Sequence, residues 1–189
     1  MNQQETDSPR QPIILLDLNY TLVANSPAHG SAPKRMERRL ADEQYRQWLV
    51  DLVRPRTVVL MTARPENWMT QTLDRIEDQT GWRPQDACFA PIGWWNPPAI
   101  KQHFLYKRVF PRHGEHAHYI AIESNPRSRE MYARHEIPCL WVTAEGDSLT
   151  SGLYIVKSLP PKPPRCDGSI CLQVHIPFIG KKRKSLPKR

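Results

Sequence analysis

The 189-residue sequence lacks several features that would assign it to a specialised class of protein. No apolar run approaches the roughly 18 residues that a membrane-spanning helix needs, so we expect no membrane partner. Residues 1–11 are polar and contain no apolar core of a secretory signal, and we therefore expect a cytoplasmic protein. No Gly-x-x-x-x-Gly-Lys-Ser/Thr pattern occurs, which argues against an ATP-binding P-loop.

The sequence also lacks the paired cysteines of a structural metal site. Its 4 cysteines are Cys88, Cys139, Cys166 and Cys171. Cys88 and Cys139 lie in apolar, strand-like runs, which favours a role as small core residues. The other two lie in loop-like sequence without a nearby histidine pair, and a bond between them is a minor alternative. We therefore predict neither a disulfide framework nor a structural metal.

Positive charge is concentrated towards the C-terminal end. The formal net charge is +8, and residues 1–156 contribute nothing to it, because their 18 basic residues balance 18 acidic ones. Residues 157–189 carry 9 Lys/Arg and a single acid, Asp167. The end of this segment, 181–189, has no acid at all. Such runs are usually solvated, but they also bind polyanions by releasing counterions, so this basic tail suggests contact with nucleic acid.

The order of apolar and helical segments predicts an α/β fold with a parallel sheet flanked by helices. Five strand-like runs alternate with helical patterns, which is typical of parallel strands joined by right-handed crossovers. The strands are predicted at 13–16, 57–61, 87–91, 119–122 and 138–142, and the helices at 35–52, 66–80, 98–110 and 126–135. We predict a disordered N-terminus over 1–11, one domain over 12–156 and a proline-rich, basic extension over 157–189.

The most informative stretch is Ile13–Leu22, in which four aliphatic residues lead directly to Asp17. A run of this kind predicts a strand that is buried on both faces. Open parallel sheets bind their ligands outside the carboxyl ends of the strands. Asp17 would therefore present a carboxylate to a substrate, although a lone aspartate in this place could equally cap the following turn.

Polar residues also follow other predicted strands. Thr62-Ala63-Arg64 follows the second strand, Lys101 lies in the helix after the third, and Glu123-Ser124-Asn125 follows the fourth. Together with Asp17 they would supply a nucleophile, cations and hydrogen-bond donors, which are the parts that phosphoryl transfer needs. Taken singly, each has a plainer interpretation: Thr62 as a helix cap, Arg64 as a solvated side chain and Glu123 as an acid favoured by a helix dipole.

In combination these segments resemble the haloacid dehalogenase (HAD) superfamily, whose first motif is an apolar strand followed by Asp-x-Asp-x-Thr/Val. The motif here is Asp17-Leu18-Asn19-Tyr20-Thr21. Over about residues 13–147, the order of the later segments is similar to that of the 3′-phosphatase domain of phage polynucleotide kinase. The resemblance implies a HAD-like Rossmann-type domain with a minimal cap, formed by a helical squiggle and a flap near residues 23–34.

The resemblance also implies an activity, that of a Mg²⁺-dependent phosphatase. Its substrate would be a phosphorylated nucleotide or nucleic acid, such as a polynucleotide 3′-phosphate, and the reaction would pass through an aspartyl-phosphate. Asp17 would be the nucleophile, and Lys101 rather than Lys107 would be the catalytic lysine.

The remaining roles also follow from the resemblance. Thr62, Ala63 and Arg64 would bind the phosphate. The side chains of Asp17 and Glu123 and the backbone carbonyl of Asn19 would hold Mg²⁺, which takes oxygen ligands and keeps several waters.

Two positions depart from the family pattern. Asn19 stands where the family has the aspartate that protonates the leaving oxygen, and Ser124 stands where a second acid is usual. Loss of a general acid–base typically costs on the order of 10²–10⁴ in rate. The sequence is therefore compatible with a slow phosphatase, with a substrate that has a good leaving group, or with a degenerate domain that binds nucleic acid or a protein partner. For a slow phosphatase, Asn19→Asp is expected to raise turnover.

Overall fold

The protein is described by a computed structural model that covers residues 11–27, 35–142 and 153–155. Over these residues the chain forms a six-stranded sheet in the order β3-β2-β1-β4-β5-β6. The strands are β1 (Ile13–Leu16), β2 (Val58–Pro65), β3 (Asp86–Ala90), β4 (Tyr119–Glu123), β5 (Cys139–Val142) and β6 (Leu153–Ile155). The strands β1 to β5 pair in parallel, and β6 pairs antiparallel with β5. The predicted α/β fold with a parallel sheet is confirmed, whereas β6 was not predicted.

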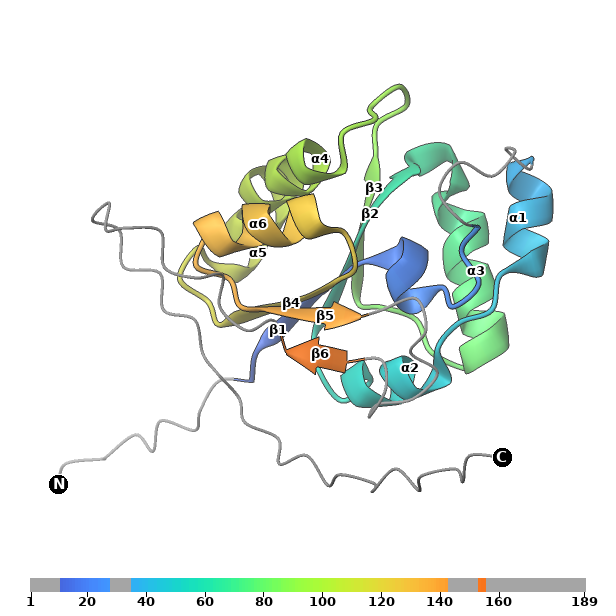
Figure 1. The fold of residues 1–189 in the computed structure, drawn as a ribbon, viewed down its shortest axis with the longest axis horizontal. Helices are drawn as coiled ribbons and strands as arrows, with labels where there is room; N and C mark the ends of the chain where they lie inside the picture. Colours follow the sequence, from blue (N-terminus) through green and yellow to red (C-terminus); the bar gives the residue numbers. More distant parts are fainter. Residues whose placement is uncertain (1–10, 28–34, 143–152, 156–189) are drawn as a thin grey trace, which may run out of the picture.

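Helices cover both faces of the sheet (Figure 1). They are α1 (Met36–Asp42), α2 (Gln47–Val53), α3 (Met69–Thr80), α4 (Pro97–Phe104), α5 (Phe110–His113) and α6 (Pro126–Arg134). A wider helical turn, Leu105–Val109, joins α4 to α5, so that residues 97–113 form one helical run. No helix in the described ranges is both long and apolar enough to cross a bilayer.

The core consists of two layers, one on each face of the sheet. Side chains of successive strand residues point to opposite faces, and β1 shows this directly. Ile14 and Leu16 pack in the layer beneath α2 and α3, whereas Leu15 packs in the layer beneath α4 and α6. All three are almost fully buried. The aliphatic run before Asp17 is therefore buried on both faces, as its composition predicted.

The predicted helix over 35–52 is wrong, because two helices, α1 and α2, occupy this segment with an extended break between them. The break contains Glu43 and Arg46, two charged residues that are only 3% exposed. Nη1 of Arg46 donates hydrogen bonds to the backbone carbonyls of Thr21 and Val23 at 2.7 and 3.0 Å. Internal hydrogen-bond partners of this kind are what allow charged side chains to be buried.

Other elements agree with the sequence prediction apart from their ends. The strand β2 continues through the segment Thr62–Pro65, which was expected to follow it, and its pairing with β3 shifts register there. Gly81 ends α3 in the left-handed conformation, with φ +61°, which glycine adopts readily at a helix C-terminus. An irregular turn occupies Leu18–Leu22, with non-helical backbone at Asn19 and Tyr20.

Several predictions lie outside the described residues. These are the minimal cap over residues 28–34, the disordered N-terminus except for Gln11, and the extension 157–189 with its cysteines and basic tail.

The strand order places a topological switch point beside β1. The chain moves from β1 through β2 to β3 in one direction, and then returns to place β4 on the other side of β1. In open parallel sheets, ligands bind outside the carboxyl ends of the strands at this point, because the connecting loops diverge there. The side chains that follow β1 and β4 therefore lie where a ligand would bind.

Candidate active site

Asp17 and Glu123 lie side by side at the switch point. Leu16 and Ile122 are register partners in the parallel pair β1–β4, and the backbone N–H of Asp17 donates to the carbonyl of Ile122 at 3.0 Å. Asp17 follows β1 directly and Glu123 is the last residue of β4, so the register brings the two carboxylates to the same edge.

Lys101 lies between these two carboxylates. It projects from α4, and its Nζ lies 2.5 Å from Oδ1 of Asp17 and also forms an ion pair with Oε2 of Glu123. Lys101 is 1% exposed, Glu123 is 0% exposed and Asp17 is 8% exposed. Charges at this depth require partners. Lys107, by contrast, lies exposed on the same helical run, as predicted.

The pKa values of both Glu123 and Lys101 are raised within this cluster. Burial and the neighbouring carboxylate of Asp17 raise the pKa of Glu123 to about 7, although Lys101 and the backbone N–H of Asn125 act against this rise. For Lys101, burial opposes the charged form, but the two carboxylates outweigh it and raise the pKa of the lysine. One ammonium between two carboxylates leaves the cluster with one negative charge in excess when both acids are ionised.

Further hydrogen bonds orient both carboxylates. Oγ1 of Thr21 donates to Oδ2 of Asp17 at 2.7 Å and accepts from the backbone N–H of Ser124 at 3.0 Å. Oε1 of Glu123 accepts from the backbone N–H of Asn125 at 2.8 Å, and the side chain of Asn125 caps the start of α6. Thr21 therefore ties the end of β1 to the end of β4 and leaves Oδ1 of Asp17 facing Lys101.

Arg64 lies in a second buried cluster and not on an open surface. Its guanidinium forms a two-pronged ion pair with Glu43, and its Nη1 donates to Oγ1 of Thr72 at 2.9 Å. Arg64 is 2% exposed. The alternative of a solvated arginine is therefore wrong, and the expected phosphate contact would require Arg64 to exchange these partners.

Asn19 is held by two guanidinium groups. Its Oδ1 accepts hydrogen bonds from Nη2 of Arg39 at 2.8 Å and from Nη2 of Arg64 at 3.1 Å. The amide oxygen of Asn19 is thus turned towards the cations, and its NH₂ group is turned the other way. Two arginines and Glu43 give this cluster a net positive charge, which contrasts with the net negative charge around Asp17.

Thr62 and Ala63 directly precede Arg64 on β2. The hydroxyl of Thr62, which is fully buried, accepts from the backbone N–H of Arg64 at 3.1 Å. Its own hydrogen can still be donated to another acceptor. Ala63 is partly buried. The structure thus gathers Asp17, Lys101 and Glu123 in direct contact, and places Thr62 and Arg64 on the strand that adjoins β1.

The oxygen atoms near Asp17 have the chemistry of a magnesium site. The donor set would be the carboxylates of Asp17 and Glu123 and the backbone carbonyl of Asn19, which accepts a long 3.4 Å bond from Oγ of Ser124. Mg²⁺ prefers such oxygen ligands. It usually keeps several waters, so one or two carboxylates from the protein are enough. The described residues contain no group of three or more His, Cys, Asp or Glu side chains arranged for a metal. The residual negative charge and the all-oxygen donors fit a divalent cation.

Sequence reasoning did not identify Arg39, Glu43, Thr72 or the bridging role of Thr21. Arg39 lies in α1, and Glu43 follows four residues later at the end of that helix. An ion pair at this spacing is usually a weak surface interaction. Nothing in the sequence linked Glu43 to Arg64, because the contact joins the segment after α1 to the end of β2.

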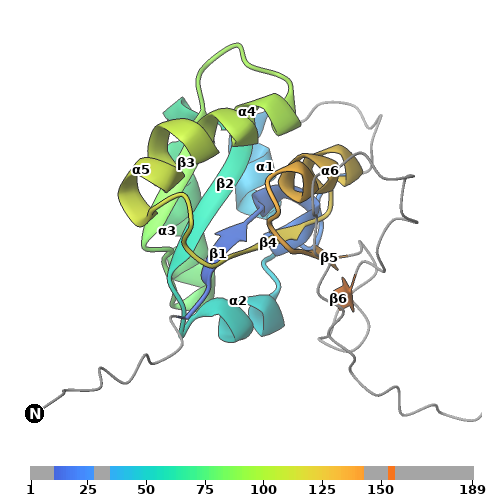
Figure 2. The same cartoon turned by 90° about the vertical axis from the view of Figure 1, so that its left-hand side faces the viewer.

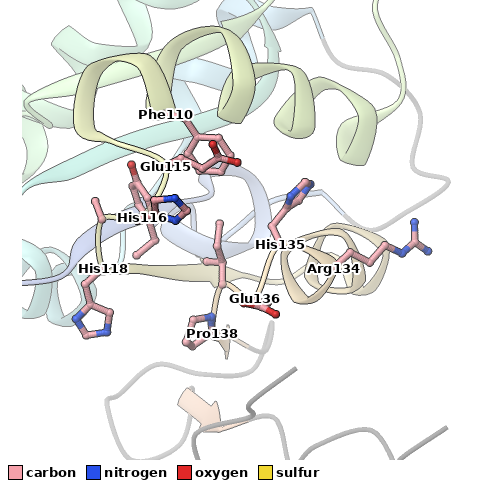
Figure 3. Close-up of a pocket in the computed structure, with 11 residues that line it drawn as sticks. Phe110, Glu115, His116, His118, Arg134, His135, Glu136 and Pro138 are labelled. Atoms are coloured by element: carbon pink, nitrogen blue, oxygen red, sulfur yellow. The ribbon is translucent and has the colours of Figure 1, made fainter. Parts of the chain in front are cut away.

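A hollow at the other end of the sheet is separate from this site. It lies where β4 begins and α6 ends, and is lined by Phe110, Glu115, His116, His118 and His135 among others (Figure 3). Because Asp17 and Glu123 lie at the carboxyl ends of the strands, this hollow at the amino-terminal start of β4 does not contribute to their chemistry.

Neither a protein-family model nor a curated protein matches the sequence. Among solved structures, a chain in the "Structure of the Pnkp1/Rnl/Hen1 RNA repair complex" has a similar fold, with a TM-score of 0.55 and 14% sequence identity. The similarity covers 72% of the present chain and 44% of that chain, so the present chain corresponds to less than half of its neighbour. At this level of identity, the similarity shows a shared fold.

Proposed function

We propose that this chain is a Mg²⁺-dependent phosphatase of the HAD type that acts on a nucleotide or nucleic-acid phosphate. The observation that carries the proposal is the buried group of Asp17, Lys101 and Glu123 at the switch point of a parallel sheet. Burying three charges to support a fold alone is costly, and hydrophobic residues of similar volume are often as stabilising. A carboxylate beside a lysine at a ligand-binding edge is instead suited to attack on phosphorus.

In this mechanism, a carboxylate oxygen of Asp17 attacks phosphorus in line with the leaving oxygen, and an aspartyl-phosphate forms as the P–O bond to the substrate breaks. Water then attacks the phosphorus and regenerates the Asp17 carboxylate. Lys101 offsets the negative charge at the reacting atoms, Thr62 donates its hydroxyl hydrogen to a phosphoryl oxygen, and Thr21 keeps the attacking carboxylate oriented. When bound by Asp17, Glu123 and the Asn19 carbonyl, Mg²⁺ would supply further neutralisation of phosphate charge.

Asn19 cannot donate a proton, so the leaving oxygen must take one from water. This favours substrates whose leaving group is stable as an anion, and it makes the enzyme slow on poor leaving groups. Because Oδ1 of Asn19 faces two arginines, its NH₂ group is available as a hydrogen-bond donor to the substrate.

A nucleic-acid or nucleotide substrate is supported by two observations. The neighbour of similar fold belongs to a structure described as an RNA repair complex. The whole formal charge of +8 comes from residues 157–189, and such a basic segment attracts polyanions. A 3′-phosphate at the end of a strand is the finer form of this proposal.

The second candidate is a degenerate domain that binds nucleic acid or a protein without catalysis. Asn19 and Ser124 replace two acids of the family pattern, and Arg64 is already paired with Glu43. This candidate predicts binding without turnover.

One assay separates the two. Release of inorganic phosphate is measured for nucleoside monophosphates, for single-stranded oligonucleotides with a 3′- or a 5′-phosphate, and for acetyl phosphate, each with Mg²⁺ and with a chelator. The phosphatase predicts metal-dependent release from at least one of them. No release from any, at an enzyme concentration that detects a single turnover, would favour the binding domain.

We predict that Asn19→Asp does not restore fast turnover, which reverses the expectation from the sequence. Arg39 and Arg64 would face the new carboxylate, and two adjacent cations keep an aspartate ionised at neutral pH. An ionised aspartate has no proton to donate, so the rate with a poor leaving group should not show the ~10²-fold gain of a general acid. The double variant Asn19→Asp/Arg39→Ala is compared with Asn19→Asp alone, because it removes one of the two cations beside position 19. A gain from Asn19→Asp alone would contradict this account of the arginine pair.

We predict that removal of residues 181–189 weakens binding to single-stranded nucleic acid and flattens its salt dependence, while hydrolysis of acetyl phosphate is retained. Each lost phosphate contact should reduce the slope of log K against log salt by about 0.7–0.9. Titrations of the full and shortened chains at several salt concentrations measure this slope. Equal slopes would show that the tail makes no phosphate contacts.

A further inference from the structure

The loop between β3 and α4 exposes a cluster of large apolar side chains. Trp95 is 84% exposed, Ile92 is 70% exposed and Trp94 is 43% exposed. They account for three of the five large hydrophobic residues that are exposed in the described ranges. Single exposed apolar residues need no explanation, but three large ones within four residues of one loop make that loop a candidate binding surface.

The loop has a defined conformation. The backbone N–H of Trp94 donates to the carbonyl of Pro91 at 3.2 Å, which closes a four-residue turn. Gly93 occupies its third position with φ +89°, a conformation that glycine adopts without strain. The ring of Trp94 packs edge-on against His103 of α4, with 5.1 Å between ring centroids. Because the loop is already ordered, a ligand that stacks on it would incur little conformational entropy loss.

The loop also lies at the same end of the sheet as the candidate site. It leaves the carboxyl end of β3, and Figures 1 and 2 both show it projecting beyond α4. Lys101 lies on the first turns of that helix, and His103, the contact of Trp94, is two residues further on. From chain geometry, the backbones of Trp95 and Lys101 are no more than about 13 Å apart.

We propose that Trp95, supported by Trp94, is a stacking platform for a base of a single-stranded nucleic acid whose terminal phosphate enters the Asp17–Lys101 site. This inference rests on the proposed function and specifies its substrate as a strand with unpaired bases. Indole rings stack on any base without sequence preference. The basic segment 157–189 complements a phosphate backbone, and α4 connects the loop that carries Trp95 to Lys101 of the phosphate site.

The test is a set of binding titrations with a fluorescent single-stranded oligonucleotide that ends in a 3′-phosphate, in the presence of a chelator to prevent turnover. A second oligonucleotide has the same backbone and phosphate but abasic sites in its last positions. Trp95→Ala should raise the Kd for the first oligonucleotide by about 5- to 100-fold. It should change the Kd for the abasic one by much less, and Trp95→Phe should retain most of the affinity.

Tyr106→Ala is the matched control, because Tyr106 is an exposed aromatic residue, at 50%, on the same helical run but away from the loop. It should leave both Kd values unchanged. Equal Kd values for wild type and Trp95→Ala, equal losses with both oligonucleotides, or no oligonucleotide binding by the wild-type chain would each overturn the platform. A loop that serves a protein partner would give the first of these results.

Hydrolysis of acetyl phosphate, which has no ring to stack, separates this test from that of the proposed function. Trp95→Ala should hydrolyse it at the wild-type rate. Base-dependent binding in a chain that hydrolyses none of the tested phosphates would support the platform and refute the phosphatase. Hydrolysis of acetyl phosphate without base-dependent binding would refute the platform and support the phosphatase.

Discussion

Lys101→Met should lower the free energy of unfolding by about 3–5 kcal/mol at neutral pH, because it leaves two buried carboxylates without their cation. Methionine nearly fills the volume of the lysine stem, so the loss would come from charge and not from a cavity. Phosphatase activity should fall to the limit of detection, since Lys101 contacts the attacking carboxylate directly. Urea unfolding and phosphate release measure the two effects.

The double variant Lys101→Met/Glu123→Gln tests the cause of the instability. If the penalty comes from carboxylates that lack a cation, removal of the charge of Glu123 should recover part of the lost stability. Lys107→Met is the control on the exposed side of the same helical run, and it should change neither stability nor activity. A double variant that is less stable than Lys101→Met alone would show that the lysine acts through packing.

The instability should also depend on pH. The pKa of Glu123 is raised to about 7 even beside Lys101, and loss of the lysine should raise it further. A carboxyl whose pKa is higher in the folded state takes up a proton on folding, so its destabilising effect shrinks as the pH falls through the folded value. With a chelator present, the stability difference between wild type and Lys101→Met should therefore be smaller at pH 5 than at pH 8.

Asp17→Asn should abolish phosphatase activity, with a loss of about 10⁴-fold or more, because the amide cannot act as the nucleophile. The fold should be retained. Asparagine is nearly isosteric, it keeps an oxygen for Lys101, and the substitution relieves the pairing of two carboxylates with one ammonium. Phosphate release and thermal unfolding are the measurements. Asp78→Asn, at an exposed position of α3, is the matched control and should keep full activity.

The central part of the fold was predictable because its signals are local. An unbroken aliphatic run before Asp17 specifies a strand buried on both faces, and regular alternation of strands and helices specifies a parallel sheet. The meeting of Asp17 and Glu123 was expected from the same logic, since the carboxyl ends of parallel strands lie at one edge. Lys101 lies on a helix, and its place beside them was expected from the family resemblance. Their contact distances now agree with that expectation.

The arginine cluster was not predictable in this way. Glu43 and Arg46 carry charge, and a periodicity argument assigns charge to the solvent side of a helix. Their burial depends on partners that are remote in the sequence, Arg64 for Glu43 and the carbonyls after β1 for Arg46. No window of sequence contains both members of these pairs. The expectation for Asn19→Asp is revised for the same reason, because it considered position 19 without its two arginines.

The most direct measurement of the central claim is chemical trapping of the intermediate. The chain is mixed with acetyl phosphate and Mg²⁺, quenched with borohydride, which reduces an acyl phosphate to an alcohol, and digested for mass spectrometry. We predict homoserine at position 17, dependent on substrate and metal and absent from Asp17→Asn. Phosphate release without any modification of Asp17, or modification at another carboxylate, would contradict the assignment of Asp17 as the nucleophile.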